Sequence, residues 1–197
     1  INGNNDATDE EKAEARKLVE KAKIEAKSNI TNSDTEREVN GAKTNGLEKI
    51  NNIQPSTQTK TNAKQEINDK AQEQLIQINN TPDATEEEKQ EATNRVNAGL
   101  AQAIQNINNA HSTQEVNESK TNSIATIKSV QPNVIKKPTA INSLTQEANN
   151  QKTLIGNDGN ATDDEKEAAK QLVTQKLNEQ IQKIHESTQD NQVDNVK

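Results

Sequence analysis

One phrase occurs three times in this chain: Asn5-Asp6-Ala7-Thr8-Asp9-Glu10-Glu11-Lys12, then Pro82-Asp83-Ala84-Thr85-Glu86-Glu87-Glu88-Lys89, then Asn160-Ala161-Thr162-Asp163-Asp164-Glu165-Lys166. The threonines in the three copies are 77 residues apart in both intervals, and no gap is needed to align them. Such a strict period is typical of a tandem array, in which each copy is a structural unit packed against its neighbours. The period therefore favours a structural or binding role over a single catalytic pocket.

Each copy of the phrase carries the Thr-x-x-Glu pattern of a helix N-terminus. In this capping box the Thr hydroxyl accepts the backbone N–H of the Glu, and the Glu carboxylate accepts the backbone N–H of the Thr. Acidic residues between them lie where the helix dipole is positive. The predicted structural caps are Thr8 with Glu11, Thr85 with Glu88, and Thr162 with Glu165.

The spacing of the aliphatic residues predicts three amphipathic helices per period. The first follows the repeated cap, and the second begins near Thr35 or Ser112. The second must end before Pro55 or Pro132, because a residue before proline avoids the helical region. The third ends near Ile78 or Ile155. The predicted core stripes include Ala15, Leu18, Val19, Ala22, Ala26 and Ile30 in the first helix, Leu47 and Ile50 in the second, Leu144 and Leu154 in the third, and Leu172 in the last copy of the first helix.

These helices predict an all-α protein built of tandem three-helix bundles that form an elongated rod. The three helices of each period are expected to pack as an up-down-up bundle. The predicted divisions are repeat 1 over residues 1–78, repeat 2 over 79–155 and a partial repeat 3 over 156–197, and residues after about His185 are expected to be the least ordered. Because only 27% of the residues are hydrophobic, a looser chain of capped helices is the alternative.

Composition limits the partners of this chain. It contains no Cys, Met, Trp, Tyr or Phe, so the usual anchors of interfaces and stacking platforms are missing. Its net charge is −7, with acids and lysines interspersed, whereas nucleic-acid binders need clustered basic groups. No stretch is long and apolar enough to span a membrane, and no secretion signal is visible. We therefore expect neither nucleic-acid binding nor membrane insertion.

No group of residues predicts catalysis, a cofactor or a metal site. The repeated acidic clusters are interpreted as helix-start electrostatics. The loop Asn157–Asp163 is rich in oxygen ligands but lacks the glycine position of an EF-hand, so it is interpreted as a turn. His111 and His185 occupy different positions of the period, and His111 is expected in a loop. The prediction is a protein that is not an enzyme.

A second recurring pair places a valine four residues before a lysine, in Val39 with Lys43, Val116 with Lys120 and Val193 with Lys197. The favoured interpretation puts the valine in the core and the lysine at its rim, where the lysine stem covers apolar surface. A ligand-facing stripe is the alternative.

The phrases Asn79–Lys89 and Asn160–Lys166 resemble the signature of the tandem domain-of-unknown-function repeats in staphylococcal cell-wall-anchored surface proteins, of the matrix-binding-protein-homologue and methicillin-resistance-associated type. The resemblance spans the whole chain. It implies an extracellular, cell-wall-anchored protein whose repeats form a helical stalk, in a family linked to adhesion and biofilm formation. It supplies no catalytic residues.

The expected function is therefore a structural spacer that projects an adhesive region. The alternative is that the repeats themselves bind a host extracellular-matrix or serum protein, or self-associate between cells. An apolar patch exposed at the same position in every copy would favour this alternative.

Overall fold

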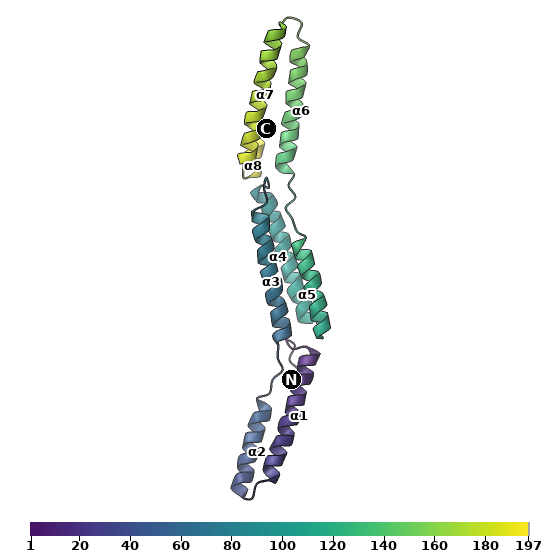
Figure 1. Cartoon of the computed structure of the whole chain (residues 1–197), viewed down its shortest axis with the longest axis vertical. Coiled ribbons are helices and arrows are strands. Elements are labelled where there is room, and N and C mark those ends of the chain that lie inside the picture. The colour runs from purple at the N-terminus through teal and green to yellow at the C-terminus, as the bar shows by residue number, and fades with distance from the viewer. Residues whose placement is uncertain (197) are drawn as a thin grey trace. The chain divides into compact units, whose positions relative to one another are not determined.

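The computed structural model describes residues 1–196, and this part of the chain is helical throughout its regular structure (Figure 1). The helices are α1 (Asp9–Thr31), α2 (Glu36–Asn51), α3 (Gln58–Asn79), α4 (Glu86–Asn109), α5 (Thr113–Lys128), α6 (Lys136–Gly156), α7 (Asp163–Glu186) and α8 (Asp190–Val196). The predicted all-α class of packed helices is confirmed.

Within residues 1–196, no helix combines the length with the apolar character that crossing a membrane requires.

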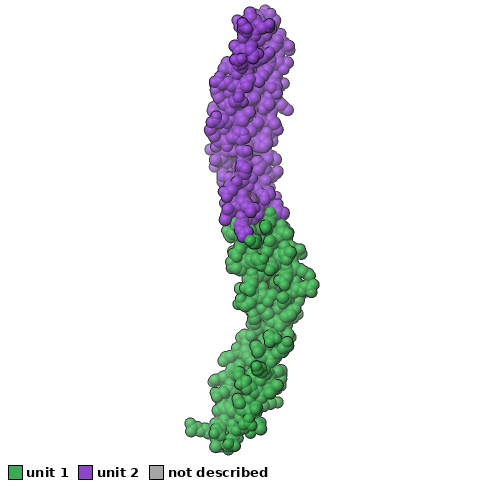
Figure 2. Space-filling model, viewed as in Figure 1, with its two compact units in different colours: residues 1–72, 98–128 green, residues 73–97, 129–197 purple. Residues whose placement is uncertain are grey.

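The chain divides into two compact units (Figure 2). Unit 1 comprises Ile1–Gln72 and Ala98–Lys128, and unit 2 comprises Glu73–Asn97 and Ser129–Lys197. The division passes through α3 and α4, so each of these two helices contributes residues to both units.

In unit 1, α1 and α2 form an antiparallel hairpin (Figure 1). Each begins with a capping box, at Thr8 and at Thr35. The two helices approach most closely at Gly46, where an added Cβ would lie 2.6 Å from the Cβ of Ala26. Glycine is therefore required there by close packing of the hairpin.

The other packed helices of unit 1 are α5 and the adjacent parts of α3 and α4. Ile67 of α3, Ile107 of α4 and Ile127 of α5 are fully or almost fully buried. The ammonium of Lys120 on α5 lies 2.7 Å from the carboxylate of Glu66 on α3. The helix expected third in the first period thus packs with helices of the second period.

This packing differs from the expected bundle, and the connections explain the difference. The chain between α2 and α3, residues 52–57, is mostly extended and contains Pro55, so α3 does not fold back on α2. The connections between α3 and α4 and between α4 and α5 are short, which favours antiparallel neighbours.

In unit 2, α6 and α7 form a second antiparallel hairpin, and α8 packs against both. Ala140, Ile184 and Val193 form its buried core, with Ile141 and Leu144 packed around them. The expectation that residues after about His185 would be least ordered is wrong for 190–196, because burial of Val193 holds α8 in place.

Several residues predicted to lie in the core are exposed. Leu18, Leu47, Leu154 and Leu172 expose between 47% and 65% of their surface. Leu18 and Leu47 belong to the α1–α2 hairpin. Leu154 and Leu172 belong to the α6–α7 hairpin, where α8 is only seven residues long. A hairpin buries one stripe of each helix, so the wider apolar face that a three-helix bundle would cover stays in solvent.

The recurring valine lies in the core where it is best enclosed, since Val116 and Val193 are fully buried. Lys120 lies at the rim beside Glu66, as the structural interpretation expects. Lys197 lies outside the described residues.

Candidate functional site: the repeated polar joint

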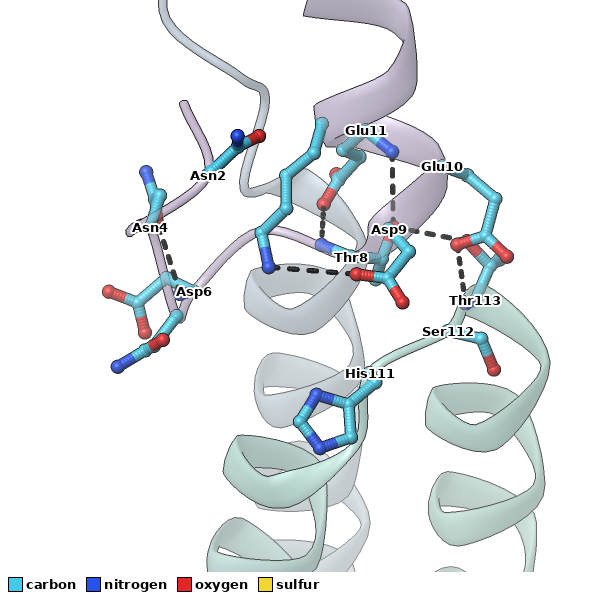
Figure 3. Close-up of polar contacts among 12 residues, drawn as sticks. Asn2, Asn4, Asp6, Thr8, Asp9, Glu10, Glu11, His111, Ser112 and Thr113 are labelled. Carbon is cyan, nitrogen blue, oxygen red and sulfur yellow. Dashed lines mark hydrogen bonds and ion pairs between the residues drawn. The ribbon is translucent and has the colours of Figure 1, made fainter.

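The start of α1 meets the ends of three other helices within unit 1 (Figure 3). We call this contact the first joint; it comprises residues 5–11, 59–60 and 108–113. At its centre Thr8 is completely buried. Its hydroxyl accepts the Glu11 N–H at 3.3 Å, and the Glu11 carboxylate accepts the Thr8 N–H at 2.9 Å. The capping box therefore lies inside the joint.

The acidic residues of this cap bind groups far away in the sequence. One carboxylate oxygen of Glu10 accepts the N–H of Thr113 at 2.9 Å and its hydroxyl at 3.0 Å. The second oxygen of Glu11 accepts the N–H and the hydroxyl of Thr59, both at 3.0 Å. These carboxylates thus cap the first turns of α5 and α3 as well as their own helix.

A buried lysine completes the first joint. The ammonium of Lys60 donates to the carbonyls of Asn5 at 2.9 Å and Asn108 at 2.8 Å, and the residue is only 2% exposed. The N–H of Asp9 also donates to the carbonyl of His111, at 2.8 Å. Main-chain groups at the end of α4, the start of α3 and the start of α1 are thereby joined.

Unit 2 contains a second joint that repeats these bonds 77 residues later. It comprises residues 82–88, 135–137 and 185–190. Its bonds are Glu86 N–H to the Thr188 carbonyl at 2.8 Å, Asp190 N–H to the Glu87 carboxylate at 3.0 Å, Ile135 and Lys136 N–H to the Glu88 carboxylate at 2.8 and 2.9 Å, and the Lys137 ammonium to the His185 carbonyl at 2.8 Å. Thr85 at its centre is completely buried, like Thr8.

The two joints differ in their side chains. In the second joint Asp83 has a left-handed backbone, with φ of 60°, and its carboxylate lies 2.8 Å from Nδ1 of His185. The same carboxylate lies 4.0 Å from the ammonium of Lys137. Asp190 replaces Thr113, so a carboxylate stands where the first joint has a hydroxyl.

The hydrogen bonds of the joints govern their carboxylates. Burial raises the pKa of Glu88, but N–H donors from Ile135, Lys136 and Thr85 outweigh burial and leave this pKa below its ordinary value. Glu11 shows the same balance, with Thr8 and Thr59 as donors. Both carboxylates therefore hold their partners in the ionised form.

The joint lysine of unit 1 is affected in the opposite sense. Burial lowers the pKa of Lys60, and the neighbouring charge of Lys64 lowers it further. The carbonyl oxygens of Asn5 and Asn108 compensate for part of the lost hydration, because each is a hydrogen-bond acceptor.

The third copy of the cap stands alone among the described residues. Thr162 and Glu165 form the capping box at the start of α7, with the Thr162 N–H and hydroxyl both 2.8 Å from the Glu165 carboxylate. Thr162 is exposed, in contrast to its buried counterparts Thr8 and Thr85. The buried state of the cap thus depends on a neighbouring set of helix ends.

Sequence reasoning found the six cap residues but missed what else they bind. The acidic clusters were interpreted as helix-start electrostatics alone, whereas Glu10, Glu11, Glu87 and Glu88 also accept N–H groups from distant segments. Lys60 and Lys137 were missed entirely. The signal that could have revealed them is their own 77-residue spacing at the head of a helix.

Two other predicted features lie where expected. His111 is in the loop between α4 and α5. The loop before α7 is a turn in which the Asn160 N–H donates to the Asp158 carboxylate at 2.9 Å.

Comparison with known proteins gives one match. The model of a family described as Domain of Unknown Function (DUF1542) matches residues 1–58, 59–135 and 136–197. These copies divide the chain at the starts of α3 and α6, where the joint lysines lie, while our division at 78 and 155 stays a prediction. No significant match was found among curated proteins or among solved structures.

Proposed function

The chain belongs to the DUF1542 family, and on this premise we propose that it is a structural spacer of a bacterial surface protein, made of helical repeats held in series by polar joints. The observation that carries the proposal is the recurrence of the joint. Two sites 77 residues apart repeat the same pattern of four linkages with buried threonines at their centres.

The chemistry of the joint supports a mechanical role. Its carboxylates and lysines bind main-chain N–H and carbonyl groups, which fix the ends of helices in place. Fixing helix ends resists rotation of one segment against the next. A spacer needs this resistance, because a flexible chain grows in length only with the square root of its residue number.

The surface also supports a spacer over a binding module. Leu18 and Leu172 are exposed at the same position of the period, but Arg95 occupies that position in the middle copy. Exposed Ile76 corresponds to Thr153 one period later. The exposed large aliphatics of residues 1–196 therefore do not form a patch common to every copy. A net charge of −7 favours mutual repulsion between neighbouring stalks.

The finer parts of the proposal rest on the resemblance to staphylococcal surface proteins. The repeats would lie outside the cell, anchored to the wall, and project an adhesive region that supports adhesion or biofilm formation. They would act without catalysis, since the ionisable groups of the joints bind main-chain atoms.

Small-angle X-ray scattering tests the spacer. Proteins with one, two and three further 77-residue copies should lengthen by an equal increment per copy, roughly 30–50 Å if helices of about 22 residues add lengthwise. The matched control carries Lys60→Met and Lys137→Met in every joint, and its increment should shrink or scatter. An intact series that grows only as the square root of copy number would contradict the proposal.

The rival function, binding of a host matrix or serum protein or self-association, is tested separately. Immobilised chain is exposed to purified matrix and serum proteins and to the chain itself. Saturable capture at micromolar concentration would favour a binding module.

A further inference from the structure

We propose that Asp190 and Glu87 form a proton-binding carboxylate pair, which makes the second joint, unlike the first, tighten on acidification. This inference concerns regulation of the joint on which the proposed function rests. It is carried by one buried atom: Oδ1 of Asp190 is enclosed and has no hydrogen-bond partner among the described residues.

The first joint shows what this position requires. There the hydroxyl of Thr113 lies 3.0 Å from the Glu10 carboxylate and 3.3 Å from the hydroxyl of Thr8. It can donate its hydrogen to the carboxylate, while the Thr113 N–H donates to the same oxygen at 2.9 Å. Glu10 therefore receives two hydrogen bonds from one residue.

The second joint keeps only one of these two donors. The N–H of Asp190 reaches the Glu87 carboxylate at 3.0 Å, as Thr113 reaches Glu10. The side chain that follows is a carboxylate, which when ionised has no hydrogen to donate. One proton taken from solvent converts either carboxyl into an O–H donor toward the other and restores the missing hydrogen bond.

The surrounding charges leave this pair under-compensated. On α6, Lys136 is the nearest cation, but its ammonium is bound to Asp194 of α8 at 2.8 Å. That bond, and then the charges of Asp194, Asp190 and Glu87, raise the pKa of Lys136. One lysine thus faces three carboxylates.

The remaining charged groups of the joint are engaged elsewhere. On α4 the Glu88 carboxylate is bound to the N–H groups of Ile135 and Lys136. The Lys137 ammonium donates to the His185 carbonyl, and the His185 ring is bound to Asp83. A proton is therefore the simplest means of satisfying Oδ1 of Asp190.

The chain supplies its own matched variants for the test. Asp190→Thr installs the residue of the first joint, Asp190→Asn supplies a neutral amide donor, and Thr113→Asp creates the pair at the first joint. Asp164→Asn removes one exposed carboxylate from the unpaired third cap and controls for net charge. The full chain is unfolded in urea at pH 7 and at pH 4, and exchange of the Asp190 amide is followed by NMR.

At pH 7, Asp190→Thr should raise the ratio of folded to unfolded protein about tenfold, which corresponds to about 1.4 kcal/mol. At pH 4, near the ordinary range of carboxyl groups, wild type should come within about twofold of the variant. The sign follows because the folded state binds the extra proton, so its advantage is present at low pH and lost as pH rises. Slowing of Asp190 amide exchange on acidification, after correction for intrinsic rates, should be absent in Asp190→Asn.

Thr113→Asp should acquire the same pH dependence, and Asp164→Asn should not. A difference between wild type and Asp190→Thr that stays constant from pH 7 to pH 4, or is absent at both, overturns the proposal. Scattering measures spacing and these experiments measure a proton at one joint. The spacer role and the proton-binding pair can therefore fail independently.

Discussion

Replacing Lys60 with methionine tests whether the polar joint stabilises the chain. Methionine keeps the length of the lysine stem and its packing, and removes the ammonium. The change deletes the hydrogen bonds to the carbonyls of Asn5 and Asn108, at 2.9 and 2.8 Å. We expect the variant to fold and to be less stable than wild type.

The size of the loss follows from three contributions. Hydrogen bonds from a charged donor contribute about 1.5–3 kcal/mol each. Burial of the ammonium opposes this gain, as the lowered pKa of Lys60 shows. A cavity of about 550 Å³, lined in part by Lys12, Lys60 and His111, lets water reach the released carbonyls. Together these give an expected net loss of about 2 kcal/mol.

Urea unfolding followed by circular dichroism measures the loss, and amide hydrogen exchange locates it. The Asp9 amide, which donates to the His111 carbonyl, should exchange at least about tenfold faster in Lys60→Met. The Glu86 amide of the second joint should be unchanged. Lys137→Met should give the reverse pattern. Lys17→Met is the control, since Lys17 is 76% exposed and should change stability by less than about 0.5 kcal/mol.

One result would refute this reasoning. If Lys60→Met unfolds at the urea concentration of wild type and leaves exchange of the Asp9 amide unchanged, the buried lysine does not hold the joint. The repeated bonds would then be a consequence of packing and not a cause of it.

Three further predictions concern the carboxylates, the glycines and the caps. Because the pKa of Glu88 lies below its ordinary value, its contribution should be present above about pH 4.3 and lost as pH falls further, so the urea midpoints of wild type and Glu88→Gln should differ at pH 7 and converge near pH 3, and parallel curves would contradict this. Gly46→Ala should destabilise by about 1–3 kcal/mol, because its Cβ would meet Ala26 at 2.6 Å, whereas Gly41→Ala, with open space around it, should stabilise by up to about 1 kcal/mol; equal melting temperatures would count against the close approach. Thr8→Ala should cost about 0.5–2 kcal/mol in thermal unfolding and exposed Thr162→Ala less, so a larger loss at Thr162 would show that burial in the joint does not strengthen the cap.

The helices and their starting points were available from the sequence because the interactions that form them are local. A capping box joins residues three apart, as in Thr8 with Glu11, and an amphipathic stripe repeats every three or four residues. The 77-residue period likewise appears in the sequence without reference to packing. The local pattern therefore identified the elements and their order.

The partners of these helices were settled only by the tertiary structure. Glu11 binds Thr59 across 48 residues, and Glu10 binds Thr113 across 103. A carboxylate at a helix start looks the same in sequence whether it faces solvent or a neighbouring helix, because its nearest residues are identical in both cases. The same holds for Leu18, whose apolar character predicted burial, although only the number of helices around it determines whether it is covered. Periodicity fixes which face of a helix is apolar, and the extended connection at 52–57 determines what that face meets.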